Sequence, residues 1–274
     1  MMGLLKRVVR GIVGAVKSTP AQVPVYVPVL QSDLLKDRTA LITGGSGGIG
    51  YAITGAFLRA GAKVIISGRN KEKLDEAVSR LTSIGNVSYV QMDNTKPASF
   101  GTILSDVGTF DILVNNAGYV GGGAFGGTSE SDYDAVLDTN LKGAFFLSQE
   151  VSRRWIANGT RGNILNVCSA SSLRPGDSPY ILSKWGMRSL TVGMAKQLIK
   201  HGIVVNGIAP GITDTDRFTN GEDNIGKSSN PSGRMVTKEE IANMATILVS
   251  PLCRMVVGDI LYMTGGGAIT TLDD

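Results

Sequence analysis

The sequence has very few of the residues that build disulfide frameworks and metal sites. Its 274 residues include two cysteines, Cys168 and Cys253, and one histidine, His201. Two widely separated cysteines cannot make a disulfide framework, and a reducing compartment is their natural setting. A single histidine excludes a histidine-rich metal site. We therefore expect a cytoplasmic protein without a bound metal.

The sequence also lacks long apolar runs and a broad excess of charge. No apolar run approaches the roughly 18 residues that a membrane span needs. The only charged residues in positions 1–17 are Lys6, Arg7, Arg10 and Lys17; removing these four from the 27 basic residues leaves 23, which equals the 23 acidic residues. The net charge of +4 therefore comes from one short segment. It does not indicate a nucleic-acid-binding face.

Residues 1–36 differ from the rest of the chain. Apolar residues recur at helical spacing in positions 4–16 and basic residues occupy the other face, and a segment with three prolines follows. We expect an arm that packs on its own subunit or on a neighbour. The alternatives are a peripheral helix on the inner membrane surface, formed by residues 1–17, and an uncleaved targeting signal.

From residue 37 onward, short apolar runs alternate with longer amphipathic runs. This pattern predicts a doubly wound α/β fold, in which a seven-stranded parallel sheet is covered by helices on both faces. One domain should span residues 37–274. Strands are expected at 38–44, 63–67, 87–92, 111–116, 163–169, 203–209 and 259–263, and helices at 48–60, 71–83, 129–157, 178–200 and 237–249.

The 36 glycines include a cluster where the first expected strand meets the first helix. In the segment TGGSGGIG, Gly44, Gly48 and Gly50 let the backbone approach a diphosphate, and the helix N-terminus offers N–H groups to it. Glycines at this junction of a strand and a helix are typical of dinucleotide binding.

The residue after the second expected strand indicates which dinucleotide binds. NAD enzymes usually place a carboxylate there for the ribose hydroxyls, whereas this chain has Gly68 followed by Arg69. A guanidinium can hold a 2′-phosphate through two hydrogen bonds, so we expect NADP(H). The alternative is that Arg69 is a solvated residue at the start of a helix.

Tyr180 and Lys184 lie four residues apart and therefore on one face of an expected helix. With the glycine cluster and the segment NNAG at 115–118, they resemble the short-chain dehydrogenase/reductase family, in its single-domain branch, over about residues 37–268. The resemblance implies a Rossmann-type fold. It also implies an NADP(H)-dependent oxidoreductase that interconverts a carbonyl and a secondary alcohol.

The resemblance assigns a role to each of four catalytic residues. Tyr180 is the general acid/base, and Lys184 stabilises its phenolate and binds the nicotinamide ribose. Asn140 holds a water that links the lysine to solvent; the alternative is a structural amide inside a helix. Ser169 holds the substrate oxygen, but its spacing to Tyr180 is shorter than usual in the family, so Ser171 remains an alternative.

The same resemblance implies a set of cofactor contacts. Asp93 would bind the adenine amino group, NNAG would line the adenosine side, and the Pro-Gly pair at 210–211 would meet the nicotinamide carboxamide. The full expected set is Gly44, Ser46, Gly48, Ile49, Gly50, Arg69, Asp93, Asn94, Asn116, Ala117, Gly118, Tyr180, Lys184, Pro210, Gly211, Thr213 and Thr215.

The substrate is expected to be a small molecule, either a polar hydroxy compound such as a sugar or polyol, or a 3-oxoacyl thioester. Segments 119–131 and 216–234 are long enough for a lid. Basic residues in or beside them would receive an acidic group or face solvent: Arg174, Arg217, Lys227 and Arg234.

Two other functions compete with this one. The first is a nucleotide-binding regulator on the same fold with its chemistry lost. The second is a membrane-attached reductase of surface-polysaccharide precursors. Members of the family are commonly homodimers or homotetramers, with the helices at 129–157 and 178–200 and the last strand at their interfaces.

Overall fold

The computed structural model describes residues 33–215 and 230–267. Residues 1–32 of the expected arm, and Arg217 and Lys227 of the expected lid, lie outside the described residues. Within these ranges, no helix is both long and apolar enough to cross a membrane. Leu35 precedes the expected domain boundary at residue 37, yet it is fully buried and its N–H donates to Ala60 O over 2.9 Å.

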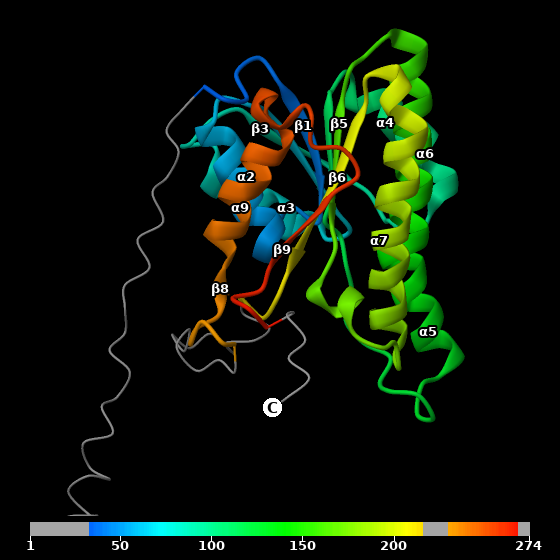
Figure 1. Ribbon diagram of the computed structural model, residues 1–274. Helices are drawn as coiled ribbons and strands as arrows, with labels where there is room; N and C mark the ends of the chain where they lie inside the picture. Colours follow the sequence, from blue (N-terminus) through cyan, green and yellow to red (C-terminus); the bar gives the residue numbers. More distant parts are fainter. Residues whose placement is uncertain (1–32, 216–229, 268–274) are drawn as a thin grey trace, which may run out of the picture.

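A seven-stranded parallel sheet forms the centre of the molecule (Figure 1). The strand order is β3-β2-β1-β4-β5-β6-β9, and every neighbouring pair is parallel. This confirms the predicted sheet. The strands are β1 (Thr39–Thr43), β2 (Lys63–Gly68), β3 (Val87–Gln91), β4 (Ile112–Asn115), β5 (Asn163–Val167), β6 (Val204–Pro210) and β9 (Ile260–Met263).

The strand order reverses between β1 and β4, and the site depends on this topology. The chain winds from β1 outward to β3 and then returns to β4 on the other side of β1. In doubly wound sheets, ligands bind in the crevice that opens at the carboxyl ends of the strands at such a reversal.

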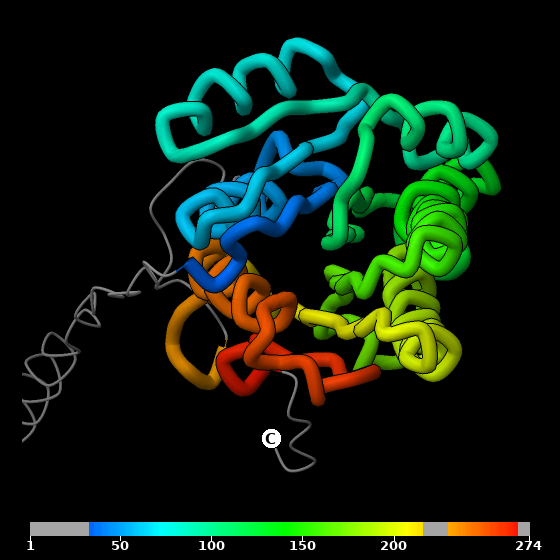
Figure 2. The backbone as a smooth tube through the Cα atoms, turned by 90° about the horizontal axis from the view of Figure 1, so that it is seen from above, coloured from blue at the N-terminus to red at the C-terminus, as the bar shows by residue number. Residues whose placement is uncertain are grey.

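Helices cover both faces of the sheet, as predicted (Figures 1 and 2). Buried side chains of α2, α3 and α9 join one core cluster, and those of α4, α6 and α7 join another. The helices are α2 (Gly48–Arg59), α3 (Lys71–Leu81), α4 (Phe100–Val107), α5 (Glu130–Leu137), α6 (Gly143–Asn158), α7 (Pro179–Leu198) and α9 (Lys238–Val249).

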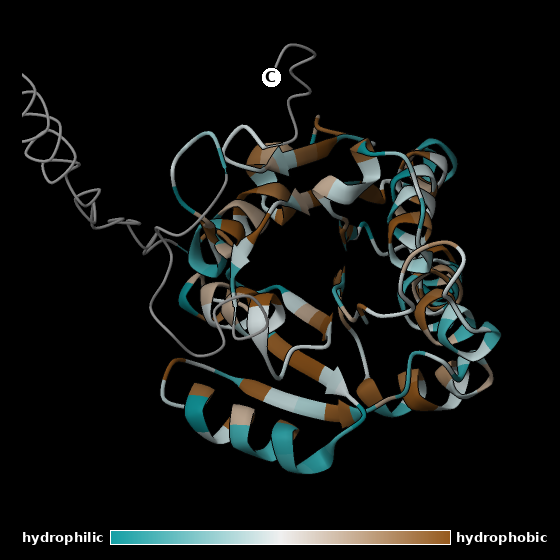
Figure 3. Ribbon diagram, turned by 90° about the horizontal axis from the view of Figure 1, so that it is seen from below, coloured by the Kyte–Doolittle hydropathy of each residue, from teal (hydrophilic) through white to brown (hydrophobic). Residues whose placement is uncertain are grey.

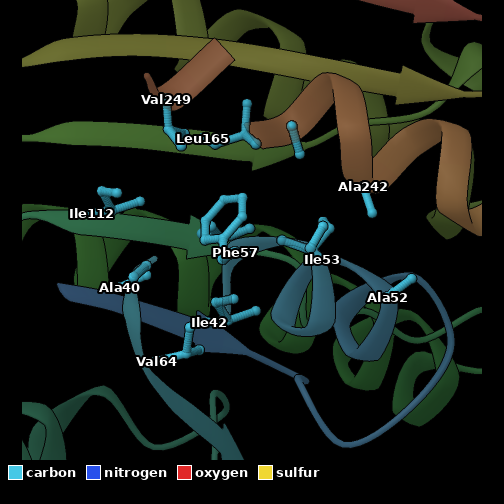
Figure 4. Packing of buried hydrophobic residues seen from close by; sticks show 14 of the residues in the cluster. Ala40, Ile42, Ala52, Ile53, Phe57, Val64, Ile112, Leu165, Ala242 and Val249 are labelled. Atoms are coloured by element: carbon cyan, nitrogen blue, oxygen red, sulfur yellow. The ribbon is translucent and has the colours of Figure 1, made fainter. Parts of the chain in front are cut away.

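The core on the α2 side fills the space between helices α2 and α9 and the sheet. Phe57 and Ile53 of α2 point toward Ile42, Val64 and Leu165 of the strands (Figure 4). All of these side chains are buried, and the opposite faces of the same strands contribute side chains to the second cluster, so these strands are apolar on both faces. Figure 3 shows hydrophobic residues concentrated along the strands and on the helix faces turned toward them.

Two helical features differ from the sequence prediction. The helix expected at 129–157 is interrupted by a π-helical turn, Asp138–Lys142, between α5 and α6. Helix α4 was not expected, because it has only eight residues, follows Pro97 closely and contains Gly101. Such a short segment carries too little periodicity to be recognised in sequence.

Candidate active site

The turn between β1 and α2 requires glycine at two positions. Gly44 has a φ of +66°, in the left-handed region that favours glycine, and a Cβ at Gly50 would collide with the carbonyl oxygen of Gly44. The N-cap of α2, Gly47, contributes no side-chain hydrogen bond. The first N–H groups of α2 therefore meet no side-chain acceptor at the cap. They face the crevice, as the N–H groups of an anion-binding helix terminus do.

Thr43 and Asn116 join the strands on the two sides of the reversal. Thr43 Oγ1 accepts hydrogen bonds of 3.0 Å from the N–H groups of Asn116 and Ala117. In return, Asn116 Nδ2 donates to Thr43 O over 2.9 Å and to Gly44 O over 3.1 Å. The glycine turn is thus held in place by the segment that follows β4.

A cavity of about 760 Å³ opens at the carboxyl edge of the sheet, and we call it the catalytic cavity. Its size is in the usual range for small-molecule and cofactor sites. It brings together most of the residues expected from the sequence: Gly44, Gly48, Ile49, Asn116, Ala117, Gly118, Ser169, Tyr180, Lys184, Pro210, Gly211, Thr213 and Thr215.

Tyr180 and Lys184 project from the first turns of α7 into this cavity. Ser178 caps the helix by accepting a hydrogen bond from Ile181 N over 3.4 Å. Lys184 is 6% exposed, and its Nζ donates to Val167 O at the end of β5 over 2.9 Å. The same Nζ lies 5.8 Å from the centroid of the Tyr180 ring. A buried ammonium is thus fixed beside the phenol.

Asn140 does not line the cavity but lies behind it, in the π-helical turn. It is 2% exposed. Its Oδ1 accepts from Tyr119 N over 2.6 Å, and its Nδ2 donates to Tyr119 O over 2.9 Å and to Ser183 Oγ over 3.0 Å. Both amide protons are therefore engaged with protein atoms, so the side chain could meet a water only through Oδ1.

Both candidate serines line the catalytic cavity, and each is 8% exposed. Ser169 Oγ accepts from Ser171 N over 3.1 Å. A hydroxyl that accepts from a backbone N–H can still donate its own proton. The Ser169 hydroxyl can therefore donate toward a ligand in the cavity.

Two residues expected at the adenosine end, Arg69 and Asp93, lie outside the lining of the catalytic cavity. Arg69 is exposed just after β2, and its carbonyl oxygen accepts from Gln91 Nε2 over 2.8 Å. After β3, Asp93 Oδ1 accepts 2.9 Å hydrogen bonds from the N–H and the hydroxyl of Thr95. The expected residues outside the cavity lining are Ser46, Gly50, Arg69, Asp93, Asn94 and Asn140.

A buried polar network beneath the site was not expected in full from the sequence. Asn115 Nδ2 donates over 2.8 Å to Asn166 Oδ1 and to Ser148 Oγ, and Asn166 Nδ2 donates to Thr191 Oγ1 over 2.9 Å. The sequence did contain a signal for it, because Asn166 is a polar residue flanked by apolar residues inside strand β5. The contact of Ser183 with Asn140 had no such signal.

Cys168 lies next to Ser169 and is 3% exposed. Burial raises the pKa of its thiol, and the charge of Lys184 opposes this only in part. A thiol held in its neutral form is a poor nucleophile. The structure thus agrees with the expectation that Cys168 is a small buried residue.

Comparison with known proteins places this geometry among related enzymes. A model of the short chain dehydrogenase family matches residues 38–225. Gluconate 5-dehydrogenase of Gluconobacter oxydans is 37% identical over 85% of this chain and 95% of its own. 3-Oxoacyl-[acyl-carrier-protein] reductase of Rickettsia bellii is 33% identical over 85% and 97%. A crystal structure of a 2-deoxy-D-gluconate 3-dehydrogenase homologue from Agrobacterium tumefaciens with bound NADP superposes with a TM-score of 0.76, at 33% identity, over 86% of this chain and 98% of that one.

Proposed function

Because the chain belongs to the short-chain dehydrogenase family, whose members are carbonyl/alcohol oxidoreductases that bind nicotinamide cofactors, we propose that it depends on NADP(H) and uses Tyr180 as its general acid/base. One observation carries this proposal. Tyr180, Lys184 and Ser169 converge on the cavity that also contains the glycine turn. The required glycines fit the diphosphate of such a cofactor, which supplies or accepts the hydride when bound.

The protein's own residues handle the proton and the substrate oxygen. During reduction, the Tyr180 hydroxyl gives its proton to the carbonyl oxygen as the carbon receives hydride. The buried Lys184 ammonium stabilises the phenolate that remains. Ser169 donates a hydrogen bond to the same substrate oxygen and holds it beside the phenol. In the oxidative direction, the phenolate removes the alcohol proton.

The preference for NADP(H) rests on the residues at the carboxyl end of β2. Gly68 stands where a carboxylate would bind the ribose hydroxyls of NAD, and Arg69 is exposed at the next position. A guanidinium there can bind a 2′-phosphate through two hydrogen bonds. The structural neighbour with bound NADP supports the same assignment. The substrate stays in two classes, a polar sugar- or polyol-type compound and a 3-oxoacyl compound, and each matches the name of a relative.

The test is NADPH oxidation with a panel of ketones from both classes, using wild type and Tyr180→Phe. We expect the variant to bind NADPH and to lose about 10²- to 10⁴-fold in kcat, the usual contribution of general acid–base catalysis. Tyr133→Phe, at an exposed tyrosine of α5, is the control and should match wild type. Robust turnover by Tyr180→Phe would contradict the mechanism. NADPH binding without turnover by wild type would favour the regulator.

We also propose that a second copy of the chain covers the outer face of α6 and α7. This face carries exposed apolar side chains, among them Phe145 and Phe146 on α6 and Leu182, Trp185 and Val192 on α7. Apolar patches of this kind typically mark an interaction surface. Light scattering coupled to gel filtration should show a dimer or tetramer, and Val192→Glu should shift it toward a smaller species. A monomeric wild type would contradict this.

A further inference from the structure

We propose that Arg174 recognises an anionic group of the substrate, a carboxylate or a phosphate, and so selects acidic hydroxy and oxo compounds. This rests on the proposed function, because it concerns the same catalytic cavity. Arg174 lines that cavity on the stretch between the short helix Ala170–Leu173 and α7. It faces the same space as Ser169 and Tyr180.

The backbone of Arg174 is fixed at both of its polar groups. Its N–H donates to Ser171 O over 3.3 Å, and its carbonyl oxygen accepts from Trp185 Nε1 over 2.7 Å. The indole of α7 thus anchors the residue from which the guanidinium extends. A cation on a fixed backbone loses less entropy when it binds a ligand than one on a mobile loop.

The charges that line the cavity are of one sign. Arg174 and Lys184 are its only charged lining residues among those the structure describes, and neither Asp nor Glu lines it. The Lys184 ammonium is buried and bonded to Val167 O, as the mechanism requires. Arg174 therefore supplies the positive charge that is available to a substrate.

The guanidinium of Arg174 has capacity for a ligand. Its closest hydrogen-bonding contact is Ser171 Oγ at 3.5 Å, which is long. In residues 33–215 and 230–267, no carboxylate forms an ion pair with it. Its planar array of N–H groups can receive a carboxylate or a phosphate at two points.

Arg234, another cation expected beside the cavity, does not have this capacity. Its two terminal nitrogens donate to the two carboxylate oxygens of Glu240 over 2.9 and 2.7 Å, and one of them also donates to Met235 O. The guanidinium of Arg234 is therefore already paired with a protein carboxylate. The comparison singles out Arg174 among the described cations that the sequence placed near the substrate.

A short chain of contacts relates Arg174 to the reacting centre. The guanidinium contacts Ser171 Oγ, and Ser171 N donates to Ser169 Oγ over 3.1 Å. Since Ser169 is the residue proposed to hold the reacting oxygen, one substrate molecule can place its reacting oxygen at Ser169 and its anionic group at Arg174. This geometry favours compounds that carry a hydroxyl or oxo group and an acidic group together.

The test compares matched anionic and neutral ligands by calorimetric binding to the full chain. One pair is D-gluconate and D-gluconamide, with NADPH bound. The other is acetoacetyl-CoA and the acetoacetyl thioester of N-acetylcysteamine, with NADP⁺ bound. In each pair the cofactor is in the form that cannot react. Wild type should bind the anionic member of one pair about 10- to 100-fold more tightly, as a charge-assisted hydrogen bond allows. A preference within the gluconate pair would identify a carboxylate as the group that Arg174 recognises. A preference within the coenzyme A pair would identify a phosphate.

Arg174→Gln should abolish the preference for the anionic member and leave the affinity for the neutral member unchanged. Arg174→Lys keeps the positive charge but not the planar guanidinium, so it should retain part of the preference. Arg153→Gln, at an exposed arginine of α6, is the matched control and should behave as wild type. Lack of an anion preference in both pairs, or its persistence in Arg174→Gln, would overturn the proposal. The binding readout does not need turnover, so this failure is distinct from failure of Tyr180 as the acid/base.

Discussion

Asn140 Nδ2 donates a hydrogen bond to Ser183 Oγ over 3.0 Å, and this contact connects the π-helical turn to the helix that carries Tyr180. The Ser183 hydroxyl in turn donates to Tyr180 O over 2.7 Å. One buried amide is therefore linked through one hydroxyl to the backbone of the proposed acid/base. π-Helical turns are rare and often occur at functional sites.

We predict that Asn140→Ala lowers both activity and stability. The variant loses the acceptor of Tyr119 N and leaves the buried Ser183 without a donor. The expected cost is about 1–3 kcal/mol in the free energy of unfolding. Loss of the fixed position of α7 should lower kcat by about tenfold or more, since small misplacements of catalytic groups are costly. Urea unfolding and steady-state kinetics measure the two effects.

Two further variants separate positioning from general destabilisation. Ser183→Ala removes the hydroxyl that accepts from Asn140 Nδ2 and donates to Tyr180 O, but it leaves both hydrogen bonds between Asn140 and Tyr119 in place. It should lower kcat with little change in KM. Thr139→Ala changes a half-buried residue of the same turn, whose hydroxyl donates to Ala135 O, and it should leave kcat unchanged. If Thr139→Ala and Asn140→Ala lowered kcat equally, the specific role of Asn140 would be refuted.

The two serines of the cavity should differ sharply in their effect on catalysis. Ser169 is the residue whose proton we expect to meet the substrate oxygen, so Ser169→Ala should lower kcat by about 10²- to 10³-fold, as loss of one oxyanion donor does. Ser171→Ala should cost much less. Single-turnover measurement of NADPH oxidation compares them directly. A larger loss in Ser171→Ala would reassign the role to that residue.

The preference for NADP(H) over NAD(H) should depend on the charge of the side chains at the carboxyl end of β2. The double change Gly68→Asp with Arg69→Ile supplies a carboxylate for the ribose hydroxyls and removes the guanidinium. We expect the ratio of kcat/KM for NADPH to that for NADH to fall by at least tenfold, because a charge-assisted pair is lost and a repulsion is added. Lys73→Ile on α3 serves as the control for loss of a nearby positive charge. An unchanged ratio in the double variant would mean that Arg69 only faces solvent.

Local patterns were sufficient to predict the fold and to select residues that line the catalytic cavity. The strands are apolar on both faces and the helices on one, so the sheet and its layers follow from periodicity. The glycine turn and the Tyr180–Lys184 pair are close in sequence, and each requires only a few neighbouring residues. They could therefore be recognised before any tertiary contact was known.

The features that escaped prediction depend on contacts between distant segments. The π-helical turn is stabilised by bonds from Asn140 to Tyr119 and Ser183, which lie 21 and 43 residues away. Arg174 and Arg234 have similar contexts in sequence, yet among the residues that the structure describes only Arg234 meets a carboxylate. The partner of a charged side chain is set by the packed fold, which composition and spacing do not reveal.

The ion pair of Arg234 with Glu240 should make a pH-dependent contribution to stability. Glu240 also accepts from Thr237 N over 2.9 Å and completes a capping box at the start of α9. The hydrogen bond from Arg234 is the main reason that the pKa of Glu240 lies below its ordinary value of 4.5. A lowered carboxyl pKa means that the stabilisation is complete above the unfolded-state pKa. It is lost as the pH falls through the folded-state value.

Glu240→Gln should therefore lower the free energy of unfolding by about 1 kcal/mol at pH 7, the scale of a partly exposed ion pair with a helix cap. The difference from wild type should shrink as the pH falls below 4.5, because the wild-type carboxylate then becomes protonated as well. Glu239→Gln changes the exposed neighbour in the same first turn, so it shares the interaction with the helix dipole but not the pair with Arg234. Urea unfolding of the three proteins between pH 7 and pH 3 measures these differences. A deficit in Glu240→Gln that stayed constant over this range, or that matched Glu239→Gln, would show that the ion pair adds nothing beyond the charge of the helix terminus.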